Sequence, residues 1–278
     1  MKRILFPTDF SETATNAFIH ALEFAKIVQG ELILLHTFEL PVFDNQFFPE
    51  NYMIIYESLQ LSQFDMFKDE IPKLRAIAEE HHLDKIKMTH RLMDGDLIYN
   101  IKKSIKDDKI DYVVMGTEGA SGWSAFFSGT NTGNVLTDIN VPLLSIPIDA
   151  KFKPIKTIGF TTRFRPKDKK ALKKILSVAK MADAEVKCLY VKTGNSDVTR
   201  ETVKKWEKDF EDEPIEFFVI TSDEVKETIL DFILYKEIDL LTMLTYKRSF
   251  FEGLFHPSLT KKFANNFDVP ILAIPIEE

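Results

Sequence analysis

The chain opens on KRILFPTDF (residues 2–10), and the same pattern returns without a gap as KTIGFTTRF (residues 156–164). Further matches follow in the same order, namely residues 31–36 with 185–190, 110–115 with 238–243 and 141–147 with 269–275. Because the matching segments keep the same order over the length of a whole domain, the sequence indicates that one structural unit occurs twice. The sequence therefore predicts two related domains, residues 1–150 and residues 151–278.

Short apolar runs alternate with helical patterns in the first copy. A helix is predicted over residues 14–28, with Ser11 as a candidate N-cap and Gly30 as its stop, and another over residues 97–105 after a Gly95-Asp96 turn. Strands alternating with helices predict βαβ units, and hence the α/β class with a parallel sheet covered on both faces. The runs with the apolar character of buried parallel strands are Ile4 to Pro7, Leu32 to His36, Tyr112 to Met115 and Leu143 to Ile146.

The composition is that of an ordinary globular protein: 278 residues, 45% hydrophobic and 28% charged, with a formal net charge of −7. An acidic balance gives no electrostatic reason for binding to nucleic acid or anionic membranes, so we expect neither partner. No apolar run approaches the roughly 20 residues that cross a bilayer, and the start, broken by Pro7, is too short for a signal peptide. Because Cys188 is the single cysteine, no intrachain disulfide can form, and we expect a cytoplasmic protein.

The segment from Met115 to Thr132 carries residue types suited to a ligand. It starts at the carboxyl end of an expected strand, where open parallel sheets bind their ligands. Gly116 and Gly119 lack a Cβ, so backbone can approach a ligand closely, and Gly129 opens a helix whose N–H groups suit a phosphate. The hydroxyls of Thr130 and Thr132 can donate to phosphate oxygens. Taken alone, the glycines also fit a simple loop, and the sequence lacks a phosphate-binding loop ending in Gly-Lys-Ser/Thr.

Asp9 ends the first expected strand, and adjacent parallel strands end at the sheet edge that carries the glycine loop. Its carboxylate can accept hydrogen bonds from ribose hydroxyls or from an adenine amino group. The alternative role for Asp9 is the N-cap of the following helix.

Together these segments resemble the universal stress protein family, in its tandem form. The opening KRILFPTDFSETA (residues 2–14) is similar to the family's start, and Gly116-x2-Gly119-x9-Gly129-Thr130 is similar to its ATP motif, G-x2-G-x9-G-[ST]. The resemblance covers nearly all of the first copy and, more faintly, the second. It implies a five-stranded parallel sheet flanked by helices in each domain, with adenosine held by the residues matching Asp9 and Thr37. The nucleotide site that it implies comprises Pro7, Thr8, Asp9, Thr37, Gly116, Gly119, Gly129, Thr130, Asn131 and Thr132.

Two residues depart from the family pattern near the expected phosphates. The family often has a basic residue at the positions of Glu118 and Ala120, and here one is acidic and the other neutral. A carboxylate beside a triphosphate is repulsive unless it faces solvent or a divalent cation intervenes. We therefore expect weaker or Mg²⁺-dependent ATP binding, or a preference for a less charged adenine nucleotide.

The second copy has lost the residues of the expected site. Side chains replace the glycines and a cation replaces the carboxylate, so we expect this domain to bind no nucleotide and to act as a structural partner. Phe250, Phe251, Leu254 and Phe255 make its equivalent loop apolar, which suggests packing against a neighbour. The replacements are Asp9 by Arg163, Gly116 by Leu244, Gly119 by Lys247 and Gly129 by Pro257.

Other chemistry-bearing residues have structural interpretations. Residues 40–56 form an aromatic-rich insertion, for which a loop packing over its own domain is favoured over a lid or partner surface. We expect His81 and His82 at an exposed helix end, His36 buried and hydrogen-bonded, and Cys188 buried and inert, with no metal site. The basic residues 163–170 are expected to form a solvated helix start.

The sequence thus predicts a stress-response regulatory protein in which ATP or a related adenine nucleotide biases conformation or partner choice, with no catalytic residue and at most slow hydrolysis. One alternative is an interaction scaffold without a functional ligand. Another, resting on fold analogy alone, is an enzyme acting on an adenylated substrate. By the resemblance, the last strands, residues 141–146 and 269–274, would meet within one chain as a pseudo-dimer, and a further homodimer stays open.

Overall fold

The computed structural model describes residues 1–39, 52–117, 135, 138–245 and 268–275. Its contacts divide the chain into two compact units, Met1–Met115 and Gly116–Glu278, which are described separately below. The cut lies within strand β4, earlier than the boundary near residue 150 that the sequence predicts. Strand β5, which the repeat assigns to the first domain, falls in the second unit, where it pairs with β10.

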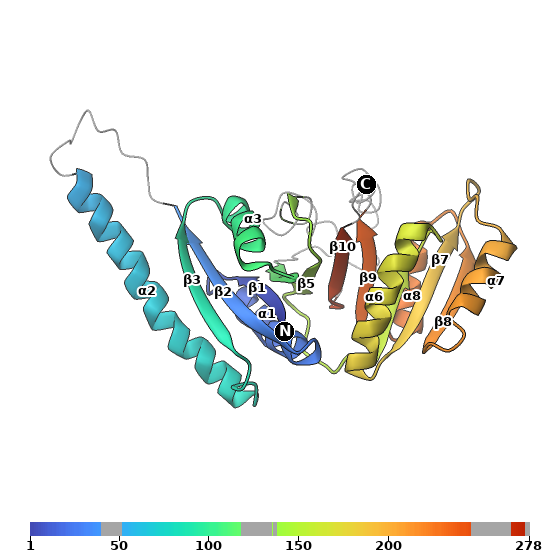
Figure 1. Ribbon diagram of the computed structural model, residues 1–278, viewed down its shortest axis with the longest axis horizontal. Coiled ribbons are helices and arrows are strands. Elements are labelled where there is room, and N and C mark those ends of the chain that lie inside the picture. Colours follow the sequence, from blue (N-terminus) through green and yellow to red (C-terminus); the bar gives the residue numbers. More distant parts are fainter. Residues whose placement is uncertain (40–51, 118–134, 136–137, 246–267, 276–278) are drawn as a thin grey trace. The chain divides into compact units, whose positions relative to one another are not determined.

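The first unit is a parallel sheet with helices between its strands (Figure 1). Its strand order is β3-β2-β1-β4, and every neighbouring pair in this order is parallel. Helix α1 packs against β1, β2 and α2, and α3 also packs against β1 and β2. The elements are β1 (Lys2–Pro7), α1 (Glu12–Ile27), β2 (Gly30–Phe38), α2 (Tyr52–Glu80), β3 (Met88–Asp94), α3 (Leu97–Asp108) and β4 (Tyr112–Thr117).

The second unit repeats this arrangement and adds β10 and β5 at one end. Its order is β5-β10-β9-β6-β7-β8, with five parallel strands from β10 to β8. Strand β5 is antiparallel to β10, with Leu144 opposite Leu272. The elements are β5 (Leu143–Pro147), β6 (Thr157–Thr161), α6 (Pro166–Ala182), β7 (Glu185–Lys192), α7 (Arg200–Asp209), β8 (Ile215–Thr221), α8 (Val225–Tyr235), β9 (Leu240–Thr245) and β10 (Ile271–Pro275). The predicted fold class is confirmed.

Local chemistry explains how α1 begins and ends. The Ser11 side chain accepts a hydrogen bond from the Ala14 N–H at 3.2 Å, as expected of the predicted N-cap. The predicted stop at Gly30 is wrong, because Gln29 takes the left-handed conformation (φ 53°) and Gly30 is the first residue of β2. A Cβ at Gly30 would lie 2.9 Å from the carbonyl oxygen of Lys2, so glycine lets β2 approach β1 here.

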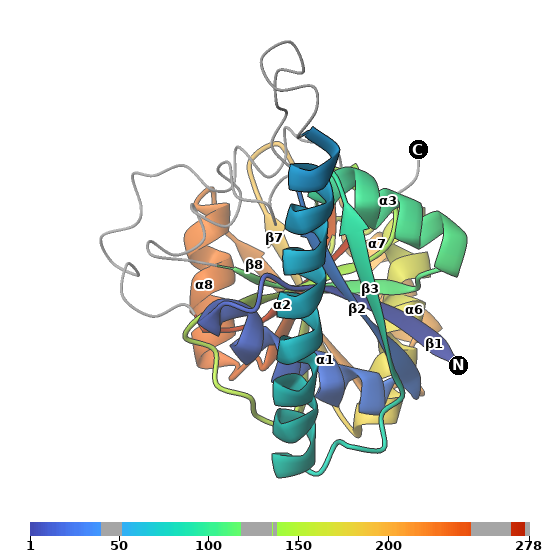
Figure 2. The same cartoon turned by 90° about the vertical axis from the view of Figure 1, so that its left-hand side faces the viewer.

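The predicted loop over residues 40–56 is wrong at its end. Residues 52–56 form the first turn of α2, and the Tyr56 hydroxyl donates to Asp94 Oδ2 at 3.3 Å. Residues 40–51 lie outside the described residues. In Figure 2, α2 faces the viewer along its whole length.

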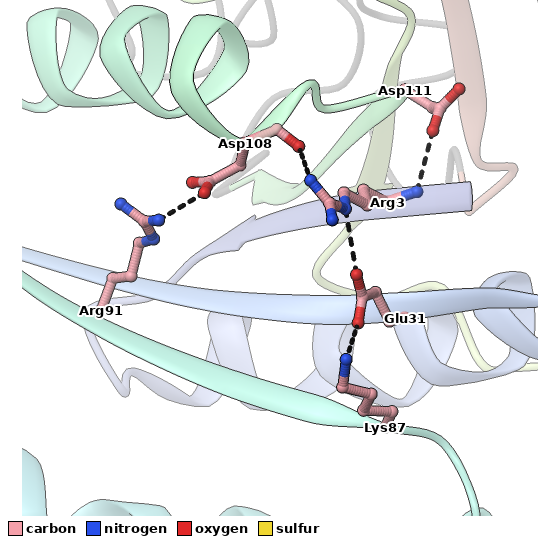
Figure 3. A network of polar contacts seen from close by, with 6 residues as sticks. All are labelled: Arg3, Glu31, Lys87, Arg91, Asp108 and Asp111. Atoms are coloured by element: carbon pink, nitrogen blue, oxygen red, sulfur yellow. Dashed lines mark hydrogen bonds and ion pairs between the residues drawn. The ribbon is translucent and has the colours of Figure 1, made fainter. Parts of the chain in front are cut away.

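A polar network ties together the amino-terminal ends of the strands in the first unit (Figure 3). Glu31, whose side chain is 8% exposed, contacts Arg3 Nε at 3.0 Å and Lys87 Nζ at 2.6 Å. Arg3 also donates from Nη1 to the Asp108 carbonyl oxygen, and Asp108 pairs with Arg91. The hydrogen bond to Lys87 is the main cause that lowers the pKa of Glu31 below its ordinary value. This network lies at the sheet edge opposite the expected ligand site.

Candidate functional site

The expected site lies where the chain reverses its direction across the first sheet. From β1 the connections lead outward to β2 and β3, and the chain then returns to place β4 on the other side of β1. Ligands of open α/β sheets bind at such a switch point, outside the carboxyl ends of the strands. Thr8 and Asp9 directly follow β1, and Gly116 is the residue before the last one of β4. Leu5 pairs with Val113, so this register sets Thr8 level with Gly116, and β4 continues two residues beyond the end of β1.

A tight turn carries Asp9 at this edge. The Thr8 N–H donates to the Leu35 carbonyl at 2.9 Å, and Thr8 Oγ1 accepts from the Phe10 N–H at 3.0 Å. Asp9 is exposed, and its Oδ1 accepts from the Ser11 N–H at 3.0 Å. Asp9 is therefore not the N-cap, a role that Ser11 takes, and its carboxylate stabilises the turn just before α1.

His36 fixes the same turn from the neighbouring strand. It is buried, as expected, and its Nδ1 lies 2.7 Å from the Thr8 carbonyl oxygen. Because a carbonyl oxygen can only accept, Nδ1 is the protonated donor here. The ring also stacks on Phe67, which holds its plane. Sequence reasoning predicted the burial of His36 but not this contact beside Asp9.

The structure describes five of the ten predicted site residues. Pro7 and Thr8 are buried at the end of β1, and Asp9 is exposed. Thr37 is half-buried in β2, two residues beyond the Leu35 that pairs with Pro7, so it stands beyond the end of β1. Gly116 is half-buried in β4. The predicted residues outside the described part of the chain are Gly119, Gly129, Thr130, Asn131 and Thr132, together with Glu118 and Ala120.

The equivalent turn in the second unit is closed by a carboxyl group from its own helix. Asp168 is fully buried in the first turn of α6. Its Oδ2 accepts from the Thr162 hydroxyl at 3.0 Å, the Arg163 N–H at 2.6 Å and the Arg165 N–H at 3.2 Å. Three donors at the end of β6 are thus satisfied inside the protein. The prediction of a solvated basic stretch over residues 163–170 is therefore wrong for Asp168.

In the first unit an alanine stands in place of this carboxyl group, because the repeat aligns Ala14 with Asp168. Thr8 keeps the same contact as Thr162, since both hydroxyls accept from the N–H two residues later. Within the described ranges, the Thr8 hydroxyl hydrogen and the Asp9 N–H meet no acceptor. In the described part of the chain, two donors therefore remain at this turn of the first domain, whereas Asp168 accepts from their counterparts in the second.

In the second domain a side chain also fills the strand end that Gly116 occupies in the first domain. Leu244, the aligned residue, is 3% exposed and packs within β9. Arg163 replaces Asp9 and is exposed on the turn. Lys247, Pro257 and the apolar residues 250–255 lie outside the described residues.

The remaining candidates that lie in the described part of the chain form no second site there. His81 and His82 are exposed after the end of α2, as expected. Cys188 is buried, and burial together with the nearby Asp168 raises the pKa of its thiol well above the ordinary value, as expected of an inert thiol. Among the side chains that the structure describes, no group of three or more His, Cys, Asp or Glu residues is placed to hold a metal ion. Nor does any helix in these ranges combine the length and apolar character needed to cross a membrane.

Comparison with known proteins finds relatives for both copies. The sequence profile of the universal stress protein family matches residues 1–147 and 154–275. Universal stress protein MJ0577 of Methanocaldococcus jannaschii is 27% identical over 152 residues, covering 52% of this chain and 94% of that protein. Universal stress protein MJ0531 of the same organism is 24% identical over 145 residues, covering 52% of this chain and 81% of that protein.

A solved structure shares the fold over nearly the whole chain. The crystal structure of a universal stress protein from Archaeoglobus fulgidus aligns with a TM-score of 0.71 at 17% identity. The alignment covers 99% of this chain and 97% of that chain. Such a likeness shows the fold, and the chemistry of the site has to be argued from its own residues.

Proposed function

Because the chain belongs to the universal stress protein family, we propose that its N-terminal domain binds ATP or a related adenine nucleotide and so regulates a stress response. Bound nucleotide would bias conformation or partner choice, with at most slow hydrolysis. The observation that carries this proposal is the difference between the two turns. Asp168 satisfies three donors in the second domain, and the counterparts of two of them, the Thr8 hydroxyl and the Asp9 N–H, meet no acceptor in the described part of the first. The third counterpart, the Ser11 N–H, donates to Asp9.

The described residues supply both kinds of hydrogen-bonding group that a nucleoside requires. The Asp9 carboxylate accepts one backbone hydrogen bond through Oδ1, which leaves acceptor capacity for ribose hydroxyls or an adenine amino group. The Asp9 N–H and the Thr8 hydroxyl are donors at the same edge, and Thr37 stands beside them on β2. These groups lie at the switch point, where this type of sheet binds its ligands.

The phosphates would lie against the glycine motif from Gly116 to Thr132, most of which is outside the described residues. Glu118 in that motif places a negative charge near them, and a divalent cation would offset the repulsion. We therefore propose Mg²⁺ as the partner of a bound triphosphate. A less charged adenine nucleotide is the preferred ligand where Mg²⁺ is absent.

Titration of the full chain with ATP, ADP and AMP, each with and without Mg²⁺, tests the proposal. Asp9→Ala should weaken binding roughly tenfold, because a hydrogen bond to a charged group is lost from the site. Arg163→Ala, at the aligned position of the second domain, is the matched control and should leave affinity unchanged. Absence of adenine nucleotide binding in every condition would leave the ligand-independent scaffold as the better function. ATP turnover by the intact chain that disappears in Gly129→Trp would instead support an enzyme.

We also propose that the two domains form an intramolecular pseudo-dimer through β5 and β10. The antiparallel pairing of these strands, with Ser145 opposite Ile271 and Leu143 opposite Ala273, supports it. An Ala273→Pro variant would remove the backbone N–H of residue 273, which lies in the paired stretch of β10. The expected result is faster limited proteolysis between residues 148 and 156.

We place the protein in the cytoplasm, where its single cysteine would stay reduced.

A further inference from the structure

Strand β8 ends the sheet of the second unit and offers an open backbone edge (Figure 1). In the described part of the chain it pairs only with β7. The Ser222 N–H donates to the Lys192 carbonyl, and the Pro214 carbonyl accepts from the Val186 N–H. The even-numbered residues of β8 therefore turn their backbone N–H and C=O groups toward β7. Because backbone groups alternate in direction along a strand, Phe217, Val219 and Thr221 turn theirs outward.

This edge lacks the features that usually protect an end strand. Such strands are commonly interrupted by proline or a bulge, or carry lysine. The sequence of β8, IEFFVIT (residues 215–221), has none of these, and Val219 and Ile220 are 46% and 38% exposed. The end strand β3 of the first unit differs, because it carries His90 and Arg91 and most of its residues are half-buried. An exposed apolar strand edge of this kind pairs readily with another strand.

A groove continues the apolar surface from β8 onto α8. Its volume is about 310 Å³, and Ile220, Phe232, Tyr235 and Lys236 contribute to its walls. Tyr235 is 82% exposed at the end of α8. The open strand and the groove together form one surface that combines backbone hydrogen-bonding groups with apolar side chains, as strand-adding interfaces do.

We propose that β8 pairs antiparallel with β8 of a second copy of this chain, around a two-fold axis at Val219. The Ile215 N–H already donates to Glu213, so the outward groups that stay unpaired among the described residues belong to Phe217, Val219 and Thr221, which are symmetric about Val219. In this register Val219 lies opposite Val219 of the other copy, and Phe217 lies opposite Thr221 of the other copy. The register thus brings outward groups opposite outward groups along the whole free edge.

The side chains fit the same two-fold arrangement. Phe218 would face Ile220 of the other copy, and Glu216 would face Ser222, so no like charges stand opposite one another. The pairing also covers part of the exposed Val219 and Ile220 side chains in both copies. A surface that complements itself in this way favours a closed two-fold dimer over an open chain of molecules. The pairing uses only the second domain and is independent of nucleotide binding.

Val219→Pro tests the hydrogen bonds. Proline removes the outward N–H of residue 219 but none of the hydrogen bonds that join β8 to β7, so the domain should stay folded. Both bonds of the central pair are lost, and the dimer dissociation constant should rise roughly 10- to 100-fold. Val219→Thr keeps the N–H and the β-branched shape, and should dimerise like the unchanged chain. Sedimentation equilibrium over a concentration series measures each constant.

Charge pairs test the register independently of proline. Val219→Lys and Val219→Glu should each disfavour the dimer, because like charges would face each other across the axis. An equimolar mixture of the two variants should restore it, since opposite charges then meet. An unchanged chain that stays monomeric at every concentration overturns the proposal. So does a dimer that Val219→Pro leaves intact, or a mixture that associates no better than its two components.

Discussion

The Thr162 hydroxyl donates a hydrogen bond to Oδ2 of Asp168 across 3.0 Å, and both residues are buried. Two backbone N–H groups converge on the same oxygen, so one side chain organises the whole turn between β6 and α6. The first domain builds the same turn with Ala14 at the aligned position and without this side chain. Among the residues that the structure describes, one copy therefore completes the turn with its own side chain, and the other leaves two of the three corresponding donors without an acceptor.

Asp168→Ala should destabilise the second domain. The substitution leaves the buried Thr162 hydroxyl and two part-buried N–H groups without their acceptor, which should cost about 3 kcal/mol of unfolding free energy. Urea denaturation followed by the fluorescence of Trp206, which packs on Phe164 of this turn, measures the loss. Asp197→Ala, which removes an exposed partner of Arg165, is the control and should have little effect. Equal losses in the two variants would contradict the role given to Asp168.

Thr242→Val should stabilise the second domain. Thr242 is fully buried in β9, and its Oγ1 meets no partner among the residues that the structure describes. Valine has nearly the same shape and removes the uncompensated hydroxyl, so unfolding free energy should rise by about 1 kcal/mol. The repeat supports the choice, because Val114 holds the aligned position and is also fully buried. Thr162→Val, which removes a hydroxyl that does have a partner, should have the opposite sign in the same denaturation assay.

Glu31→Gln should weaken the first domain in a pH-dependent way. Lys87 and Arg3 lower the pKa of Glu31 in the folded state, so its contribution is full above the unfolded-state pKa of about 4.3. That contribution is lost as the pH falls through the lower folded-state pKa. Because Arg3 and Lys87 are 44% and 62% exposed, solvent screens both pairs, and we expect about 1 kcal/mol near neutral pH.

The control for this prediction is Glu185→Gln, at the aligned position of the second domain. Glu185 pairs with Lys187 but its side chain is 55% exposed, so the change should be close to zero. Unfolding free energies of both variants are compared with the unchanged chain from neutral pH down to the acid limit of folding. A Glu31→Gln deficit that grows as the pH falls would have the wrong sign and would refute the assignment.

Much of the fold could be predicted from the sequence, because buried strands appear in it as short continuous runs of apolar residues. The runs over β1, β2, β4 and β5 were identified in this way, and Ser11 was recognised as the N-cap of α1. The end strands β3 and β8 were not identified individually, because each mixes polar and apolar residues and is only half covered. The end of α1 was misplaced because Gln29, rather than a glycine, takes the left-handed conformation.

For the site, strand ends were the informative signal. The residues that follow β1 and the residues at the end of β4 were expected at one edge of the sheet. The pairing of Leu5 with Val113 places the two sets there at the same level. The role of Asp168 was missed because it lies among lysines, in a stretch whose composition is typical of solvent exposure. The signal that could have found it was the repeat itself, which sets an acid opposite Ala14 at the third position of a helix.

Ala14→Asp should transfer the closed turn of the second domain to the first. Ala14 is 8% exposed and occupies the place in α1 that Asp168 occupies in α6. The new carboxylate can accept from the Thr8 hydroxyl and the Asp9 N–H, the donors that we assign to the nucleotide. It also adds negative charge where phosphates or ribose would approach. Nucleotide affinity should fall roughly 10- to 100-fold, while thermal stability should hold or rise, because an acid in the first turn suits a helix.

Titration with the tightest-binding adenine nucleotide measures the change in affinity, and a thermal melt measures the change in stability. Asp168→Ala is the matched control, since it alters the other turn and should leave affinity untouched. Full affinity in a folded Ala14→Asp protein would mean that the ligand does not use this turn.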